Sequence, residues 1–163
     1  MRLVLFVFLL GFACESRAQK EIRVQGMKFT YQLLQNELEI ELSAPTQGWL
    51  GIGFNRENNI VKSDLLLFRV KNGQAEGRDM YVLGFGNPRQ DQDLGGKSDF
   101  RILAFQEKAG STWIRFRIPL QSGDDYDFSH RVGEKIWLIL AYSVDDDFGH
   151  HSRMRQHLAF QLK

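Results

Sequence analysis

Short apolar and aromatic segments, separated by turn residues, succeed one another along most of this 163-residue chain and limit the folds open to it. Glu37–Leu42 alternates strictly between acidic and apolar residues, which is typical of a strand with one face in water. Ile136–Tyr142 is apolar at every position, as in a strand covered on both faces. No window of eleven or more residues shows helical apolar spacing. The pattern predicts an all-β fold, a two-sheet antiparallel β-sandwich.

Turn residues set the expected boundaries of the strands. Lys71-Asn72-Gly73 is a strong hairpin signal, and Ala109-Gly110-Ser111 separates two segments that we expect to pair. Residues 84–96 form the longest stretch in which we expect no regular structure. The expected strands are Met27–Leu34, Glu37–Leu42, Gly48–Phe54, Asp64–Val70, Arg78–Phe85, Phe100–Gln106, Thr112–Pro119, Ile136–Tyr142 and Arg155–Leu162.

The first eighteen residues have the organisation of a secretory signal peptide. Arg2 precedes an apolar run over residues 3–13, and Ser16 and Ala18 are small residues at the −3 and −1 positions of a cleavage site. The run is too short to cross a bilayer. Cys14 is the only cysteine, and the residues before it match a lipoprotein signal poorly. Cleavage after Ala18 therefore leaves a mature chain without cysteine.

We predict a signal peptide over residues 1–18 and one domain over residues 19–163, secreted or periplasmic and held together by its core. Without the signal peptide, the 21 basic and 20 acidic residues fall to 19 of each. This balance offers no basic excess for nucleic acid or for an anionic membrane surface. The sequence after residue 18 contains no repeat and no apolar segment that could span a membrane.

Glycines interrupt the apolar segment Gly48–Phe54. Gly48, Gly51 and Gly53 fall within six residues, beside Trp49. Glycine inside a strand usually marks a bulge or a place where something approaches the backbone closely. Two explanations fit: the sheet curves beside the large Trp49 side chain, or a flat, bulky ligand lies on the strand. The pattern alone leaves both open.

A polar cluster at residues 145–151 follows the apolar segment 136–142 and contains three aspartates and two histidines. It is a solvated loop, a metal site with Asp and His ligands, or the source of one imidazole ligand for a group held against the sandwich. Adjacent histidines on an extended segment point to opposite sides, so we do not expect His150 and His151 to reach one ion together.

Catalytic motifs are missing from the sequence. It contains no Gly-x-Ser-x-Gly, no phosphate-binding loop and no cysteine nucleophile after residue 18. No acid–base pair stands out either. We therefore predict a binding or electron-transfer domain rather than an enzyme.

Taken in order, parts of the chain between residues 25 and 163 resemble a DOMON domain. The residues that carry the likeness are Gly48–Phe54, Ser63-Asp64, Lys71-Asn72-Gly73, Asp79, Gly84, Pro88, Asp91, Ile136–Tyr142, His151 and Arg155. The resemblance implies an immunoglobulin-like β-sandwich that binds b-type haem or a sugar. It also implies a place outside the cytoplasm and a redox partner, which here would be a separate exported protein.

For the haem-binding members of that family, the resemblance implies two axial ligands, a methionine after the Trp-Gly strand and a histidine near the last strand. His151 matches the histidine and is the predicted ligand of the haem iron. The methionine position falls on Ile60, which has no lone pair for iron. Met80 lies in a predicted strand, where filling the core is the simpler role, and Met154 is expected opposite His151.

Three hypotheses follow from the likeness and from the missing methionine. The domain binds haem b through His151, alone or with His150 or water as sixth ligand, in a redox or sensing role. Alternatively it is a haem-free module in which Trp49, Phe54, Trp137 and Tyr142 form flat platforms for a carbohydrate or another ligand, or it is a protein-interaction domain. The predicted cofactor-site residues are His151, Trp49, Gly51, Gly53, Phe54, Ile60, Trp137 and Tyr142.

Overall fold

The structure, a computed structural model, describes residues 20–163, so the predicted signal peptide lies outside the described residues. The elements are β1 (Lys20–Val24), β2 (Met27–Leu33), β3 (Glu37–Ala44), β4 (Leu50–Asn55), β5 (Asp64–Lys71), β6 (Gln74–Gly84), β7 (Asn87–Gln90), the 3₁₀ helix η1 (Asp91–Leu94), β8 (Arg101–Lys108), β9 (Ser111–Pro119), β10 (Lys135–Tyr142) and β11 (Met154–Gln161).

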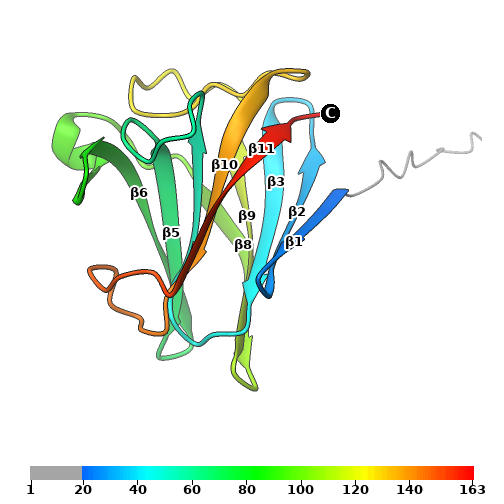
Figure 1. The fold of residues 1–163 in the computed structure, drawn as a ribbon, viewed down its shortest axis with the longest axis vertical. Coiled ribbons are helices and arrows are strands. Elements are labelled where there is room, and N and C mark those ends of the chain that lie inside the picture. Colours follow the sequence, from blue (N-terminus) through cyan, green and yellow to red (C-terminus); the bar gives the residue numbers. More distant parts are fainter. Residues whose placement is uncertain (1–19) are drawn as a thin grey trace, which may run out of the picture.

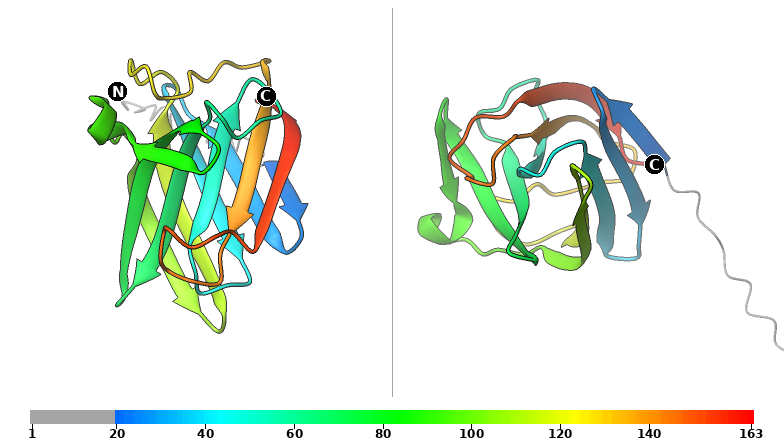
Figure 2. Two further views of the ribbon diagram at one scale, coloured as in Figure 1. Left: turned by 60° about the vertical axis from the view of Figure 1, so that its left-hand side comes forward. Right: turned by 90° about the horizontal axis from the view of Figure 1, so that it is seen from below.

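These strands form two antiparallel sheets that pack face to face (Figures 1 and 2). One sheet has five strands in the order β1-β2-β3-β9-β8, and the other has six in the order β11-β10-β4-β5-β6-β7. The predicted antiparallel β-sandwich is confirmed, as are the hairpins β5–β6 and β8–β9. Within residues 20–163, no helix is long and apolar enough to cross a lipid bilayer.

The sequence analysis missed two edge strands. β1 carries only two apolar residues in five, so its strand signal is weak. β7 and η1 lie inside residues 84–96, where the expectation of no regular structure was wrong. In a sequence, a proline such as Pro88 argues against a strand. An edge strand such as β7 tolerates proline because one row of its backbone groups has no partner strand.

The core lies between the facing sides of the two sheets and follows the two-residue period of the strands. In β3, Leu38, Ile40 and Leu42 are fully buried, whereas the glutamates between them are half-buried on the other face. Aromatic contacts join the sheets: the ring centroids of Phe68 in β5 and Phe116 in β9 lie 4.4 Å apart. Such pairs stabilise a core beyond their buried area.

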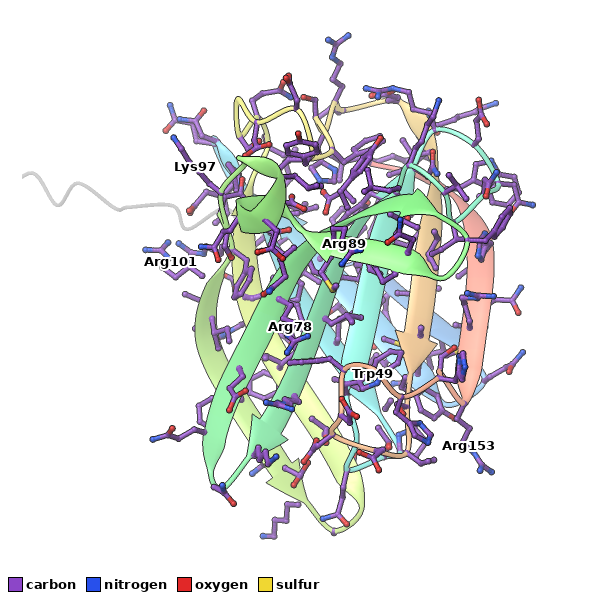
Figure 3. All side chains as sticks on the ribbon, turned by 90° about the vertical axis from the view of Figure 1, so that its left-hand side faces the viewer. Trp49, Arg78, Arg89, Lys97, Arg101 and Arg153 are labelled. Atoms are coloured by element: carbon purple, nitrogen blue, oxygen red, sulfur yellow. The ribbon has the colours of Figure 1, made fainter. Side chains whose placement is uncertain are left out.

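A second, smaller apolar cluster lies on the outer face of the six-stranded sheet. It consists of Trp49, Leu67, Met80 and Ala141. β5 and β10 are therefore apolar on both faces, which agrees with the unbroken apolar run of β10. Figure 3 shows this outer face, with the loop after β10 lying over one end of it beside Trp49.

Candidate ligand-binding pocket

A pocket of about 520 Å³ opens on the outer face of the six-stranded sheet. This volume falls within the range of about 300–1,000 Å³ that is usual for small-molecule and cofactor sites. Side chains of β5 and β10 form an apolar floor, made of Leu65, Leu67, Ile139 and Ala141. The walls come from the β4–β5 loop, the β6–β7 hairpin and the β10–β11 loop.

Gly51 and Gly53 lie in β4, between the floor residues of β5 and β10. A Cβ atom on Gly51 would lie 2.8 Å from Leu67 Cδ2 and 3.3 Å from the Trp49 ring. A Cβ atom on Gly53 would lie 3.3 Å from Ile139 Cβ and equally close to the Asp64 carbonyl oxygen. Packing against Trp49 and Leu67 accounts for Gly51, and Gly53 keeps the floor low beside Ile139.

Gly48 allows two segments of backbone to approach closely. A Cβ atom there would lie 2.5 Å from the amide nitrogen of Asp145 and 2.6 Å from the carbonyl oxygen of Ser143. Two backbone hydrogen bonds hold this approach, from Trp49 N to Asp145 O at 3.1 Å and from Ser143 N to Trp49 O at 2.9 Å. The Trp-Gly segment therefore anchors the β10–β11 loop, which carries both histidines of the pocket.

Hydrogen bonds fix the orientation of the His150 ring. Its Nδ1 atom lies 3.0 Å from the carbonyl oxygen of His151 and 3.1 Å from the Ser143 hydroxyl. The carbonyl can only accept, so a neutral ring that bonds it through Nδ1 has Nε2 free to ligate a metal. Trp49 Nε1 donates to the His150 carbonyl oxygen at 3.2 Å. A ring held in this way is typical of a histidine that ligates a metal through Nε2.

His150 and His151 both line the pocket. The expectation that they point to opposite sides assumed an extended segment. That premise is wrong, because residues 150–152 form a loop and β11 begins only at Met154. The His151 ring makes no hydrogen bond within residues 20–163, although its backbone carbonyl accepts from the Ser143 hydroxyl at 3.2 Å.

Of the other predicted site residues, Trp49 and Ile60 also line the pocket. Ile60 comes from the β4–β5 loop, which follows β4 at the far end from Trp49, so it reaches the pocket from the side opposite the histidines. The structure thus places His151, Trp49 and Ile60 around one pocket, together with His150.

Three of the predicted aromatic platform residues lie elsewhere. Phe54 is fully buried between the sheets, and Tyr142 points into the same core, where its hydroxyl donates to the Gln25 carbonyl oxygen at 3.4 Å. Trp137 is half-buried and does not line the pocket. The proposed platform of four aromatic side chains is therefore not formed.

No methionine of residues 20–163 replaces the one expected at position 60. Met27 and Met154 lie in the core between the sheets. Met80 packs in the outer cluster with Trp49 and Leu67, which agrees with its predicted role as a core filler, and it does not line the pocket.

The sequence analysis missed the aromatic walls of the pocket. Phe85, in the β6–β7 hairpin, is 82% exposed and lines the rim. Phe148 lies in the β10–β11 loop, and the guanidinium groups of Arg69 and Arg78 lie 4.6 and 4.7 Å from its ring centroid. These cation–π contacts hold the loop against β5 and β6. No local sequence pattern predicts these contacts, because Arg69 and Arg78 lie 79 and 70 residues before Phe148 in the chain.

The fold and the pocket agree with comparisons to known proteins. The profile of the DOMON domain matches residues 24–143, most of the chain. The chain belongs to the DOMON domain family. DOMON domains occur in extracellular or secreted proteins.

Two relatives are much longer than the part that matches this DOMON domain. MOXD1 homolog 2 of Drosophila melanogaster is 27% identical over 122 residues, which cover 73% of this chain and 15% of that protein. DBH-like monooxygenase protein 2 of Mus musculus is 31% identical over 110 residues, which cover 67% of this chain and 17% of that protein. The chain thus spans less than a fifth of either relative.

Solved structures with the same fold include two cytochrome domains. The cytochrome b domain of pyranose dehydrogenase from Coprinopsis cinerea superposes with a TM-score of 0.61 at 12% identity, covering 83% of this chain and 76% of that one. The cytochrome domain of Myriococcum thermophilum cellobiose dehydrogenase also gives 0.61, at 13% identity, covering 89% of this chain and 82% of that one. At these identities the likeness shows the fold.

Proposed function

We propose that this DOMON domain binds b-type haem in the pocket on the outer face of the six-stranded sheet. The observation that carries the proposal is the placement of two imidazoles beside an apolar floor of suitable size. The cytochrome b domains that share the fold support it. Haem would supply one-electron chemistry or the binding of a small ligand at iron.

The residues of the pocket fit a single strong axial ligand from the chain. His150 is the better oriented of the two histidines, because its Nδ1 is held by the His151 carbonyl and the Ser143 hydroxyl. His151 is the residue that the family likeness selects. On the other side Ile60 offers no donor atom. If haem binds here, a histidine would hold its iron and Ile60 would supply no second ligand, which would leave iron free to bind a small molecule.

An open position favours sensing of a small ligand over rapid electron transfer, because ligand exchange at iron accompanies changes of redox state. We infer a non-catalytic domain that is exported and acts with a redox or signalling partner. Its pocket contains imidazoles, Ser152 and Arg155 as polar groups, and no nucleophile–base pair among the lining residues.

The absorption spectrum tests the proposal. Protein purified from haem-replete cells, or mixed with haemin, should show a Soret band at about one equivalent per chain. His150→Ala should remove most of that band, and His151→Ala should weaken it less, since the His150 ring is the one held in place. His157→Ala is the matched control, because its ring lies on β11, bonds Asn58 Oδ1 at 3.0 Å and does not line the pocket.

A gain of function gives the complementary test. Ile60→Met places a thioether opposite the histidines, so the spectrum of the haem complex should shift to a six-coordinate, low-spin form. An unchanged spectrum would show that Ile60 does not face the iron. Equal haem binding by wild type, His150→Ala and His151→Ala would refute histidine ligation altogether.

Absence of any Soret band in the wild type would favour a haem-free binding module. In that case the exposed Phe85 at the pocket rim makes contact with another protein the better alternative. The carbohydrate platform predicted from the sequence is not supported, because Phe54 and Tyr142 are buried in the core.

A further inference from the structure

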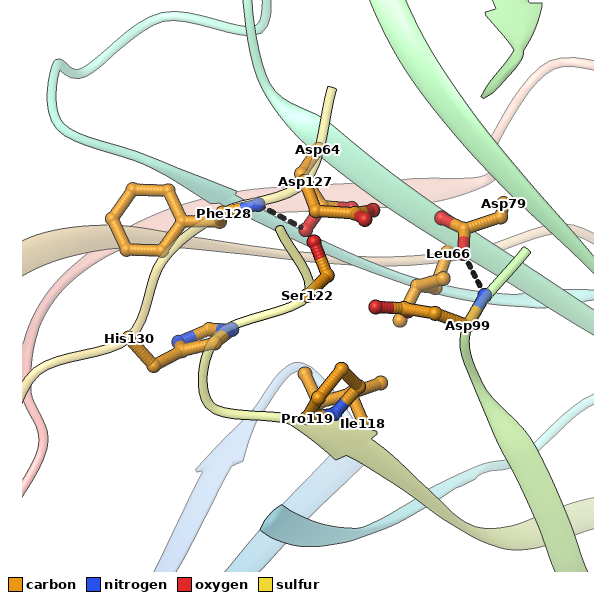
Figure 4. A pocket seen from close by; sticks show the side chains of 10 residues that line it. All are labelled: Asp64, Leu66, Asp79, Asp99, Ile118, Pro119, Ser122, Asp127, Phe128 and His130. Atoms are coloured by element: carbon orange, nitrogen blue, oxygen red, sulfur yellow. Dashed lines mark hydrogen bonds between the residues drawn. The ribbon is translucent and has the colours of Figure 1, made fainter. Parts of the chain in front are cut away.

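Five aspartates from distant parts of the chain converge between the sheets, away from the histidine pocket. Asp64 begins β5, Asp79 lies in β6, Asp91 begins η1, Asp99 precedes β8, and Asp127 lies between β9 and β10. Figure 4 shows the carboxylates of Asp64, Asp127, Asp79 and Asp99 facing a common space. Antiparallel pairing of β5 with β6 brings the first two together, and the long connections bring the others.

Three of these carboxylates are close enough to share one ion. One oxygen each from Asp64, Asp79 and Asp127 lie within 4.8 Å of one another. Asp64 and Asp79 are only 6% and 4% exposed. Oxygen ligands at the 2.3–2.6 Å distance of Ca²⁺ lie at most about 5 Å apart across the ion. The spacing is therefore that of a Ca²⁺ coordination shell.

Asp64 and Asp79 each accept a backbone hydrogen bond with one carboxylate oxygen and leave the other oxygen free. Asp64 Oδ2 accepts from the amide of Phe128 at 2.9 Å, and Asp79 Oδ2 accepts from the amide of Asp99 at 3.1 Å. Within residues 20–163, the Oδ1 atoms of Asp64 and Asp79 are buried and have no hydrogen-bond donor. Buried oxygens without a donor destabilise the folded state unless they are protonated or bind a cation.

Asp91 is a further buried carboxylate of the cluster. It is fully buried, it interacts with Asp127, and neither of its carboxylate oxygens has a donor within the described residues. The ion pairs of residues 20–163 leave all five aspartates without a lysine or arginine partner. A buried charge without a partner is rare in proteins.

We propose that Asp64, Asp79 and Asp127 form a Ca²⁺ site, with Asp99 beside them in the same void. This void is about 10 Å³, room for one water-sized ion, and Ser122 and His130 are its other polar lining residues. Carboxylate oxygens suit a hard cation, and Ca²⁺ accepts the irregular geometry that Mg²⁺ tolerates poorly. Leu66 and Ile118 close the site toward the core.

The site has a clear structural role. Asp99 and Asp127 belong to the two long connections, whereas Asp64 and Asp79 belong to the six-stranded sheet. One ion bound by both groups would fasten the segment before β8 and the β9–β10 connection to the end of the sandwich. This inference concerns residues remote from the histidine pocket and does not depend on haem binding.

Thermal unfolding with Ca²⁺ as the only added metal tests the site. At Ca²⁺ about 100-fold above its Kd, the Tm should rise by about 5–10 °C over the value in EGTA. Asp127→Asn keeps the side-chain shape but removes a charge, so it should abolish that rise. Asp125→Asn is the matched control, because it removes an exposed carboxylate two residues away and should leave the rise unchanged.

A second measurement covers the case in which Asp127→Asn does not fold. Tb³⁺ added to the wild type should bind with luminescence sensitised by the neighbouring Tyr126, and Ca²⁺ should displace it competitively. The proposal is overturned if Ca²⁺ leaves both the Tm and Tb³⁺ binding unchanged, if Asp127→Asn responds to Ca²⁺ like wild type, or if Mg²⁺ or Zn²⁺ raises the Tm more than Ca²⁺ does.

Discussion

The histidine pocket lies on the outer face of the six-stranded sheet, and the aspartate cluster lies on its core-facing side. The two differ in size, polarity and donor atoms. The pocket is open, its floor is apolar and its donors are imidazoles. The cluster surrounds a much smaller void of about 10 Å³, and its donors are carboxylate oxygens. Imidazole suits iron, whereas carboxylate suits Ca²⁺. One sheet can therefore carry two sites that select different metals.

The two-residue period of the strands makes this arrangement possible. Asp64 faces the interior while Leu65, the next residue, forms part of the pocket floor. Asp79 and Met80 in β6 divide between the faces in the same way. Because neighbouring residues serve opposite faces, a substitution at one site should leave the other site working. The predictions below test that independence.

The largest effect is expected from Gly48→Ala. The new Cβ atom would lie within 2.7 Å of backbone atoms of Ser143 and Asp145, which cannot move without separating the β10–β11 loop from β4. We expect a loss of about 2–3 kcal/mol in the free energy of unfolding, measured by urea denaturation, and weaker haem binding. The Ca²⁺-dependent rise in Tm should persist.

Gly84→Ala is the control for that experiment. An added Cβ atom at Gly84 has no heavy atom within 4 Å, so stability should change by less than about 0.5 kcal/mol. If Gly48→Ala were as stable as this control, the close approach of the two segments would have no energetic importance.

Gly53→Val should have the next largest effect and should act on the pocket. Its side chain would press against Ile139 and raise the floor, at a cost of about 1–3 kcal/mol. Haem titration should show reduced uptake. Gly53→Ala adds one carbon at 3.3 Å and should give a smaller change in the same direction. Wild-type melting and wild-type uptake in Gly53→Val would show that this glycine has no special role.

The cluster should make stability depend on pH. Because the pKa of Asp79 is raised to about 8 in the folded state, the folded chain holds more protons than the unfolded chain up to that pH. In chelator, the free energy of unfolding should therefore fall from about pH 6.5 to about pH 8, by about 1.4 kcal/mol per pH unit for each proton involved. Saturating Ca²⁺ should flatten this dependence.

The pH range is chosen to avoid the histidines. Burial lowers the pKa of His130 to about 4, so this residue binds a proton on unfolding only below its ordinary value, about 6.5. The contribution of neutral, buried His130 to stability is lost as the pH falls below about 6.5. Above that pH, His130 is neutral in both the folded and the unfolded state. A stability that rises across pH 6.5–8 in chelator would contradict the raised pKa of the cluster.

The smallest effect is expected from Trp49→Phe, which removes the hydrogen bond from Nε1 to the His150 carbonyl oxygen. We expect a loss of about 1 kcal/mol and faster dissociation of haem, since the loop that carries His150 is held less firmly. Trp113→Phe removes a similar 3.2 Å bond, to Glu41 on the other sheet. It should cost comparable stability without changing haem dissociation.

Much of the sandwich could be predicted because its strands alternate clearly. Glu37–Ala44 and Ser111–Pro119 show one buried and one exposed face in the sequence itself. Of the pocket, the sequence singles out residues at its two ends, Trp49 and His151 at one and Ile60 at the other. Its floor was not predicted, because Leu65 and Ile139 read equally well as core residues when both faces of a strand are apolar.

The aspartate cluster could not be predicted, although its signal is present. Asp64 stands in phase with Leu66 and Phe68 on the core-facing side of β5, so an acidic residue occupies an apolar face. An acidic residue at this position indicates a cluster only when Asp79 and Asp127 are known to lie beside it. Asp127 is 63 positions further along the chain and lies in a segment without periodicity.

The shortest strand of the sheet also affects how copies of this chain meet in solution. β7 is four residues long, contains Pro88 and Arg89, and forms one edge of the six-stranded sheet. Proline offers no N–H to an incoming strand. A short, charged edge strand also disfavours the edge-to-edge pairing of sheets that leads to aggregates. The hairpin that walls the pocket thus also keeps the sheet from extending into a neighbouring molecule on that side.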